Sequence, residues 1–182
     1  MKLYEKLDDR IRNFIAKQHV FFVATAPRAD DGHINLSPKG YDSFVVIDDL
    51  TVAWLDLGGS GIETLAHLKE NGRITIMFCA FEGAANILRL YGQGEAVQFD
   101  DERFPDLLAL FPNYEKARAI VVVKLDRIQD SCGWGVPFME FKSERDQLNR
   151  YVDRPDRSLD DWKTKWRTGN ATSIDGLPGI ES

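Results

Sequence analysis

Short apolar segments, several of them alternating with polar residues, recur along the chain and predict a mainly β protein. Turn-forming residues divide the first four segments into two hairpins, because proline, aspartate and glycine favour tight connections. The segment 87–99 contains glycines that predict a bend within one long strand. The predicted strands cover residues 19–26, 33–40, 44–47, 51–57, 73–81, 87–99 and 119–132.

Helical periodicity is confined to shorter stretches around these strands. Apolar residues recur at three- and four-residue spacing from Leu3 to Ile15, which predicts an amphipathic helix of about four turns. Three further helices are predicted, at 62–71, at 101–112 with Asp100 as its cap, and near 143–151.

The strands adjoin in hairpins and do not alternate regularly with helices, which argues against a parallel sheet. We expect a six- to seven-stranded antiparallel barrel with flanking helices, forming one domain over residues 1–182. The C-terminal segment, about 143–182, is more polar, yet it keeps Ile174, Leu177 and Ile180 at three-residue spacing. This spacing predicts a tail that packs on the barrel or on a partner subunit, and a frayed end is the alternative.

Charge and composition narrow the class of protein. The net charge of −6 argues against general binding of nucleic acid or anionic membranes. The charged N-terminus lacks the apolar run of a signal peptide, and no stretch approaches 18 apolar residues, so we expect a cytoplasmic protein. Cys79 and Cys132 form no CxxC motif and the three histidines lack metal-type spacing, so no metal site is predicted.

The second predicted strand, within "HINLSPKG", carries the first candidate site. Polar and apolar residues alternate in it, so Asn35, Ser37 and Lys39 share one face. Pro38 stops ladder pairing and Gly40 permits a sharp bend, which presents Lys39 at the strand end. Such donors suit a phosphate or the acceptor-rich edge of a ring, and a solvated strand face is the alternative.

A glycine-rich loop, "GGSG" at 58–61, leads into the helix predicted at 62–71. Unpaired N–H groups and the positive end of the helix dipole make such an entrance suitable for an anion. Ser60 and Glu63 also match an S-x-x-E capping box, which explains both residues without a ligand. The loop matches neither GxGxxG nor a Walker lysine motif.

Other residues give weaker signals. Trp134, between two glycines, either packs on a neighbouring element or forms the side of a flat ligand site. Arg89 shares a strand face with Tyr91 and is a candidate second cation, with a surface or ion-paired arginine as the alternative. Phe78 is interpreted as core and cleft wall, and Cys132 as an inert thiol without a basic partner nearby in the sequence.

The order of these motifs resembles the pyridoxamine 5′-phosphate oxidase-like family of FMN-binding split β-barrels. The segment "LKENGRITIMF" is similar to that family's helix-to-strand signature. A bacterial subgroup carries HxNLSPKG, GSGxET, MFCAFEG, LRLYG, SCGxGVP and SIDGLP. The corresponding stretches here are 33–40, 59–64, 77–83, 88–92, 131–137 and 173–178.

The resemblance implies a homodimer with FMN bound in two clefts between the subunits. In this family the second strand contacts the flavin and phosphate, and the loop and helix start hold the phosphate. An aromatic ring would cover one face of the flavin. The residues expected to bind FMN are Asn35, Ser37, Lys39, Ser60, Gly61, Thr64, Phe78, Arg89 and Trp134.

The chain departs from the true oxidases in two places. Glu63 and Thr64 stand where the oxidases carry a basic Arg-Lys pair, so Lys39, Arg89 and the loop amides would have to attract the phosphate. The C-terminus also lacks the Trp and Arg/His motif with which the oxidases hold pyridoxal phosphate. Oxidation of vitamin B6 itself is therefore not expected.

We expect an FMN-dependent oxidoreductase that acts on an unidentified small molecule, with a nicotinamide nucleotide as a candidate electron donor. The sequence shows no separate acid or base, which favours hydride or electron transfer over hydrolysis. Two alternatives stay open. One is a flavin-binding carrier, sensor or store without turnover, and the other is the same barrel holding haem or a deazaflavin.

Overall fold

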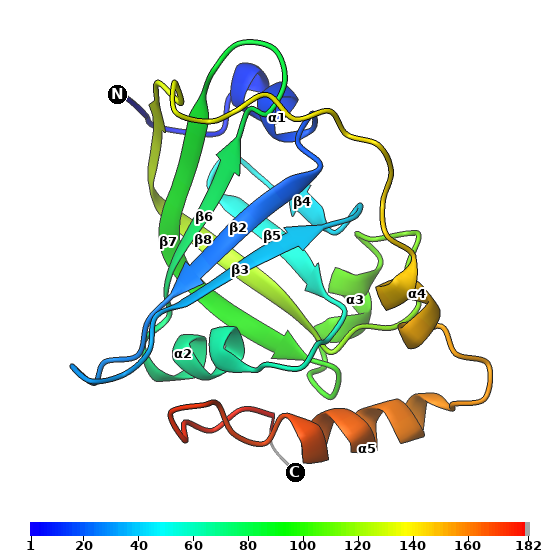
Figure 1. Ribbon diagram of the computed structural model, residues 1–182. Coiled ribbons are helices and arrows are strands. Elements are labelled where there is room, and N and C mark those ends of the chain that lie inside the picture. The colour runs from blue at the N-terminus through cyan, green and yellow to red at the C-terminus, as the bar shows by residue number, and fades with distance from the viewer. Residues whose placement is uncertain (181–182) are drawn as a thin grey trace.

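Within residues 1–180, eight antiparallel strands form one curled sheet, and the predicted split barrel is confirmed (Figure 1). The computed structural model describes residues 1–180. Seven strands follow the order β3-β2-β6-β7-β8-β5-β4, and the short β1 pairs with β8 off this path. The strands are β1 Lys2–Tyr4, β2 Val20–Thr25, β3 Asn35–Gly40, β4 Phe44–Val46, β5 Thr51–Asp56, β6 Arg73–Cys79, β7 Ile87–Gln98 and β8 Ala119–Ser131.

Helices flank this sheet. α2 packs against β2, β6 and β7, and Figure 1 shows α5 running across the same end of the molecule, followed by the C-terminal tail. Among residues 1–180, none of the helices combines the length and apolar character needed to span a bilayer. The helices are α1 Asp9–Ile15, α2 Glu63–Asn71, α3 Phe104–Leu108, α4 Gln147–Val152 and α5 Leu159–Gly169.

Aromatic side chains fill the interior of the barrel. Phe21 of β2 and Phe78 of β6 lie 5.6 Å apart between ring centroids, and Phe44 lies 5.1 Å from each of them. Phe21, Phe78 and Trp54 are at most 3 % exposed. Burying large rings stabilises the sheet.

The predicted bend in the long strand is confirmed at Gly92. The pairing of β7 with β8 shifts between Tyr91 and Gly92, as in a β-bulge. A Cβ atom on Gly92 would lie 2.1 Å from the carbonyl oxygen of Lys124. Only glycine therefore allows the two backbones to approach this closely.

The N-terminal helix is shorter than predicted. Residues 2–4 form β1 instead, and Leu3 lies opposite Gln129 of β8. α1 begins at Asp9 because the side chain of Asp8 accepts a hydrogen bond from the backbone N–H of Ile11. The prediction was wrong for the first residues because the edge of β8 offers them ladder hydrogen bonds.

The helix predicted at 101–112 is also shorter, since α3 covers only Phe104–Leu108 and Asp100 does not cap it. The carboxylate of Asp100 binds Lys163 and Arg167 of α5. No prediction was made for α5, because its two buried tryptophans lie among many charged residues. The capping box that begins α5, between Ser158 and Asp161, was the available sequence signal.

A buried ion pair joins the barrel to the loop before α2 and to the end of α5. Arg118 Nη2 donates to Asp56 Oδ2 at 2.9 Å, and both side chains are 4 % exposed. Arg118 Nη1 also donates to the carbonyl oxygen of Gly61 and to Asn170 Oδ1. Burial alone raises the pKa of the Asp56 carboxyl, but Arg118 and Lys39 outweigh it and hold this pKa below its ordinary value.

Asp56→Ala should leave the guanidinium of Arg118 buried and without its counter-charge. We expect the free energy of unfolding to fall by about 3–5 kcal/mol, as for other broken buried pairs. Urea denaturation followed by tryptophan fluorescence measures the change. Arg150→Ala is the control, because it removes an exposed pair with Asp146 and should change stability by less than about 1 kcal/mol. Equal losses in the two variants would contradict the role given to Asp56.

Candidate functional site

Strand β3 presents three predicted residues on the inner face of the sheet, and the prediction that they share one face is confirmed. Residues that lie opposite each other in an antiparallel pair project to the same side of the sheet. The β2 side chains opposite the three predicted residues are buried, so the three project to the inner face. Leu36, between them, projects to the outer face and is exposed. The pairs are Thr25↔Asn35, Val23↔Ser37 and Phe21↔Lys39.

A chain of hydrogen bonds links β3 to α2. Asn35 Nδ2 donates to Thr64 Oγ1 at 2.9 Å and to Thr25 Oγ1 at 3.2 Å. Ser37 Oγ donates to Asn35 Oδ1 at 2.9 Å, and Thr25 Oγ1 lies 2.9 Å from His67 Nδ1. The structure thus brings together Asn35, Ser37 and Thr64, and it adds two residues that the sequence analysis did not select.

Those two residues, Thr25 and His67, are both buried. Thr25 continues the inward-facing alternation of β2, and His67 lies one helical turn after Thr64, so spacing was the signal that could have found them. Burial lowers the pKa of His67, because the imidazolium would lose its hydration. Its Nε2 atom has no hydrogen-bond partner among the described residues.

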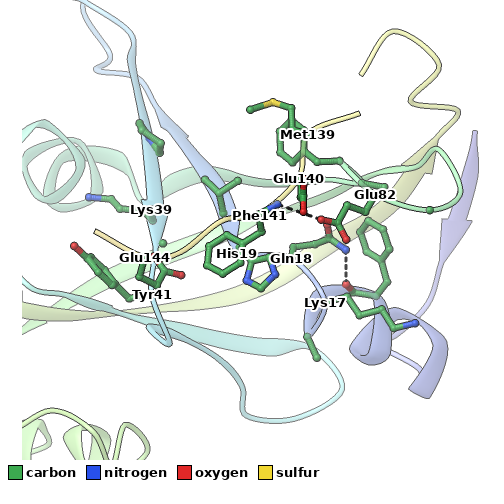
Figure 2. A pocket seen from close by; sticks show the side chains of 18 of the residues that line it. Lys17, Gln18, His19, Lys39, Tyr41, Glu82, Met139, Glu140, Phe141 and Glu144 are labelled. Carbon is green, nitrogen blue, oxygen red and sulfur yellow. Dashed lines mark hydrogen bonds between the residues drawn. The ribbon is translucent and has the colours of Figure 1, made fainter. Parts of the chain in front are cut away.

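Lys39 lines a large groove of about 1750 Å³ (Figure 2). The groove lies between the end of α1, the ends of β2 and β3, the loop 80–84 and the extended segment 139–145. Figure 2 shows His19 and Phe141 side by side, with ring centroids 3.6 Å apart. Lys39 makes no hydrogen bond or ion pair with residues 1–180, but its charge helps to lower the pKa of the Asp56 carboxyl. Its side chain projects to the inner face of the sheet, whereas Phe22 and Pro38, which also line the groove, project to the outer face.

The capping box predicted at the start of α2 is wrong. Ile62 is the N-cap residue, and no side chain caps the helix. Glu63 Oε1 instead accepts a hydrogen bond from the backbone N–H of Ile174 in the tail, at 3.4 Å. A Cβ atom on Gly61 would lie 2.3 Å from Glu63 Oε2, so the carboxylate folds over the glycine loop. A negative charge therefore lies where an anion was predicted.

Ser60 lies away from the groove of Lys39. It is exposed and lines a second hollow of about 650 Å³, between the glycine loop and helices α4 and α5. Tyr151, Lys165 and Trp166 line the same hollow. Within one chain, then, Ser60 and Lys39 face different cavities.

Three further candidates lie apart from the β3 face. Phe78 is 1 % exposed inside the aromatic core, so its ring lines no open surface of the single chain. Arg89 lies opposite Met77 on the outer face of the sheet, and its Nη1 donates to Ser131 Oγ at 3.0 Å. Trp134 is 86 % exposed in the loop after β8.

The C-terminal tail lies against both segments that build the site. Asp175 accepts from the backbone N–H of His33 at 2.8 Å and lies 2.7 Å from His33 Nδ1, which raises the pKa of His33. Gly179 packs against Ile62 at the start of α2. Residues 181–182 of the predicted tail lie outside the described residues. Within 1–180, no three His, Cys, Asp or Glu side chains gather as metal ligands would.

Known proteins share this sequence pattern and this fold. The family described as "Pyridoxamine 5'-phosphate oxidase" matches residues 7–132. The pyridoxamine 5′-phosphate oxidase family protein ustO of Aspergillus flavus is 34% identical, over 98% of this chain and 78% of the relative.

Solved structures with the same fold are more distant in sequence. HupZ of Group A Streptococcus has a TM-score of 0.56 and 21% identity, covering 69% of this chain and 94% of its own. A putative pyridoxamine 5′-phosphate oxidase of Lactobacillus delbrueckii has a TM-score of 0.53 and 18% identity, covering 71% and 99%.

A third solved structure is described as a pyridoxamine 5′-phosphate oxidase-related, FMN binding protein of Nostoc punctiforme. It has a TM-score of 0.53 and 8% identity, covering 68% of this chain and 82% of its own. At such identities these structures support the fold, whereas the family follows from the sequence matches. The chain belongs to the pyridoxamine 5′-phosphate oxidase family.

Proposed function

We propose that the protein is an FMN-binding oxidoreductase that acts on a small molecule still to be identified. Family membership supports a flavin nucleotide, and the Nostoc punctiforme protein of the same fold is described as FMN binding. The observation that carries the proposal is the inner face of β3. There, a row of amide and hydroxyl groups ends in a lysine that makes no hydrogen bond or ion pair within residues 1–180.

The residues of this face fit a flavin nucleotide. Lys39 supplies a cation for the phosphate, and a charge-assisted bond is about twice as strong as a neutral one. Thr64 Oγ1 accepts from Asn35 and keeps its own hydroxyl hydrogen for a ligand. Glu63 is unfavourable, because its carboxylate would repel a phosphate at the start of α2. We therefore assign the phosphate to Lys39 and not to the helix start.

The chain's residues bind and orient the cofactor, while FMN supplies the transfer of hydride or electrons when it is bound. Lys39 fixes the charged end. Asn35 and Thr64 form a rigid polar edge, because each is held by hydrogen bonds to neighbouring elements. The filled aromatic core behind β2 and β6 keeps water from that side of the site.

A homodimer is part of the proposal. Ile34, directly before β3, and Leu36, on its outer face, are 76 % and 64 % exposed, and exposed apolar side chains favour contact with another protein surface. Lys39 and Arg89 project from opposite faces of the sheet in one chain. Both cations contact one phosphate only if Arg89 comes from the second copy.

The absorption spectrum of the purified protein tests the cofactor, and anaerobic mixing with NADH or NADPH tests the reaction. We propose a nicotinamide nucleotide as the electron donor and the cytoplasm as the location. Bleaching of the flavin bands and their return in air would support an oxidoreductase. Bound flavin that neither nucleotide bleaches would favour a carrier or sensor. A haem or deazaflavin spectrum would overturn the proposal.

Lys39→Ala should weaken FMN binding by roughly 1–3 kcal/mol, because one charge-assisted hydrogen bond to the phosphate is lost. Lys39→Arg keeps the charge and should bind more tightly than the alanine variant. Quenching of FMN fluorescence measures the affinity. Lys124→Ala, an exposed lysine on β8, is the control and should bind as the unaltered protein does. An unchanged affinity in Lys39→Ala would remove this lysine from the site.

Leu36→Glu should convert the dimer into a monomer and release the flavin, because a charge would be buried between the two copies. Size-exclusion chromatography with light scattering gives the mass. The unaltered protein should have twice the mass of one chain, and Leu36→Glu should have the mass of one chain. Leu110→Glu, at an exposed leucine outside the sheet, should remain dimeric. A monomer that still holds flavin would contradict the intersubunit site.

A further inference from the structure

We infer that the hollow between the glycine loop and helices α4 and α5 is a second ligand site, which takes a small aromatic carboxylate. The inference goes beyond the proposed function, because this hollow is separate from the inner face of β3 and from the groove of Lys39. Its volume of about 650 Å³ lies within the range of about 300–1,000 Å³ that small-molecule sites occupy.

The apolar part of the lining comes from both helices. Leu148 and Tyr151 belong to α4, and Trp166 belongs to α5. Trp166 is 4 % exposed, and its ring centroid lies 5.6 Å from that of Trp162. Trp162 in turn contacts Tyr151 edge-on, at 4.9 Å between ring centroids. Aromatic rings that are held by their neighbours suit a ligand that is itself a flat ring.

The charge of the lining is of one sign. Lys165 is the charged residue that lines the hollow, and no carboxylate of residues 1–180 lines it. Lys163 and Arg167 of the same helix both pair with Asp100. No carboxylate pairs with Lys165 in the part of the chain that the structure describes, and its Nζ lies 4.6 Å from the ring centroid of Tyr151. The hollow therefore presents one cation beside an aromatic surface.

The hydroxyl of Tyr151 indicates a positive potential beside this lysine. A hydrogen bond with Lys165 is the largest cause that lowers the pKa of Tyr151, and Arg157 lowers it further against the effect of burial. A phenol loses its proton more readily where negative charge is stabilised. Arg157 also lowers the pKa values of Asp156 and Asp161, so these carboxylates offset its charge. Lys165 is then the cation that remains for a ligand.

The glycine loop adds donors and a fixed position. The backbone N–H groups of Gly59 and Ser60 make no hydrogen bond within residues 1–180. Arg118 Nη1 donates to the carbonyl oxygen of Gly61 and to Asn170 Oδ1, which ties the loop to the end of α5. Because both sides of the hollow are held together in this way, a ligand finds its walls already ordered, which favours binding.

The charges select a carboxylate over a phosphate. One lysine balances one negative charge, whereas phosphate is usually bound by several donors that include arginine. Glu63 folds over Gly61 beside the loop without lining the hollow, and it would repel a dianion more strongly than a monoanion. A neutral compound would cover the Lys165 ammonium without supplying a counter-charge.

Titration with benzoate, followed by backbone amide NMR, tests the site in the protein as purified. We expect saturable shifts centred on Gly59, Ser60 and Lys165. Benzamide keeps the ring without the charge, and acetate keeps the charge without the ring, so each should bind roughly tenfold more weakly. The absence of saturable shifts, shifts centred on β3, or equal binding of benzoate and benzamide would overturn the inference. Inorganic phosphate that binds more tightly than benzoate would overturn the assignment to a carboxylate.

Lys165→Gln removes the cation of the hollow. We expect benzoate to bind roughly tenfold more weakly, because one charge-assisted hydrogen bond is lost at an exposed position. Lys163→Gln is the matched control on the same helix, outside the lining, and should bind benzoate within about twofold of the unaltered protein. Benzamide should bind equally to both variants, which a general disturbance of α5 would prevent. Equal benzoate affinities in the two variants would overturn the role of Lys165.

Gly59→Leu places a side chain at the edge of the hollow. A Cβ atom on Gly59 meets no atom within 4 Å, so leucine enters open space, and benzoate binding should be lost. Gly135→Leu, in the loop after β8, is the control, because a Cβ atom there also meets no atom within 4 Å. Thermal unfolding shows that both variants fold. Unchanged benzoate binding by Gly59→Leu would overturn the inference.

FMN binding by the same variants separates this inference from the proposed function. Gly59→Leu should bind FMN as the unaltered protein does, because the hollow lies apart from β3. Loss of FMN together with benzoate would place both ligands in one site and overturn the inference. A protein that binds benzoate as expected and no FMN would overturn the proposed function alone.

Discussion

The pairing register between β2 and β3 decides the chemistry of this protein. Because side chains alternate along a strand, a slip of one residue would send Asn35, Ser37 and Lys39 to the outer face and bring Leu36 inside. Phe21 and the other buried side chains of β2 oppose such a slip, since they would lose their places in the aromatic core. The ordinary hydrophobic packing of the barrel thus holds the polar row of β3 on the inner face of the sheet.

The C-terminal part of the chain completes this arrangement from outside the sheet. The guanidinium of Arg118 connects the end of β5, the loop before α2 and Asn170 at the end of α5 in one buried network. The tail then contacts His33 before β3 and Glu63 at the start of α2. The C-terminal tail, which is distant in sequence, therefore contacts the chain just before β3 and the start of α2, the two segments that carry the polar residues.

Sequence patterns predicted what depends on local order. Alternation located the strands and the shared face of β3, and glycine located the bend at Gly92. The predictions failed where the contacts of a residue come from a segment that is distant in the sequence. Glu63 was expected to cap α2, but its carboxylate accepts a hydrogen bond from Ile174 of the tail, more than a hundred residues away. Arg89 lies on the other face of the sheet from Lys39, which follows only from the pairing of β6 with β7 and with β2. The residues expected to bind FMN remain predictions. Among them, only Asn35, Ser37 and Thr64 are joined to one another by hydrogen bonds within residues 1–180.

The position of β3 at the end of the sheet has a consequence for assembly. An outermost strand normally offers unpaired backbone groups on which another chain can add indefinitely. Pro38, in the middle of β3, has no N–H to give to a further strand, and the charged Lys39 follows it. Growth along this edge is thereby disfavoured, so an association of copies through a face of the sheet, which can close on itself as a symmetric pair, is favoured over open-ended addition of strands.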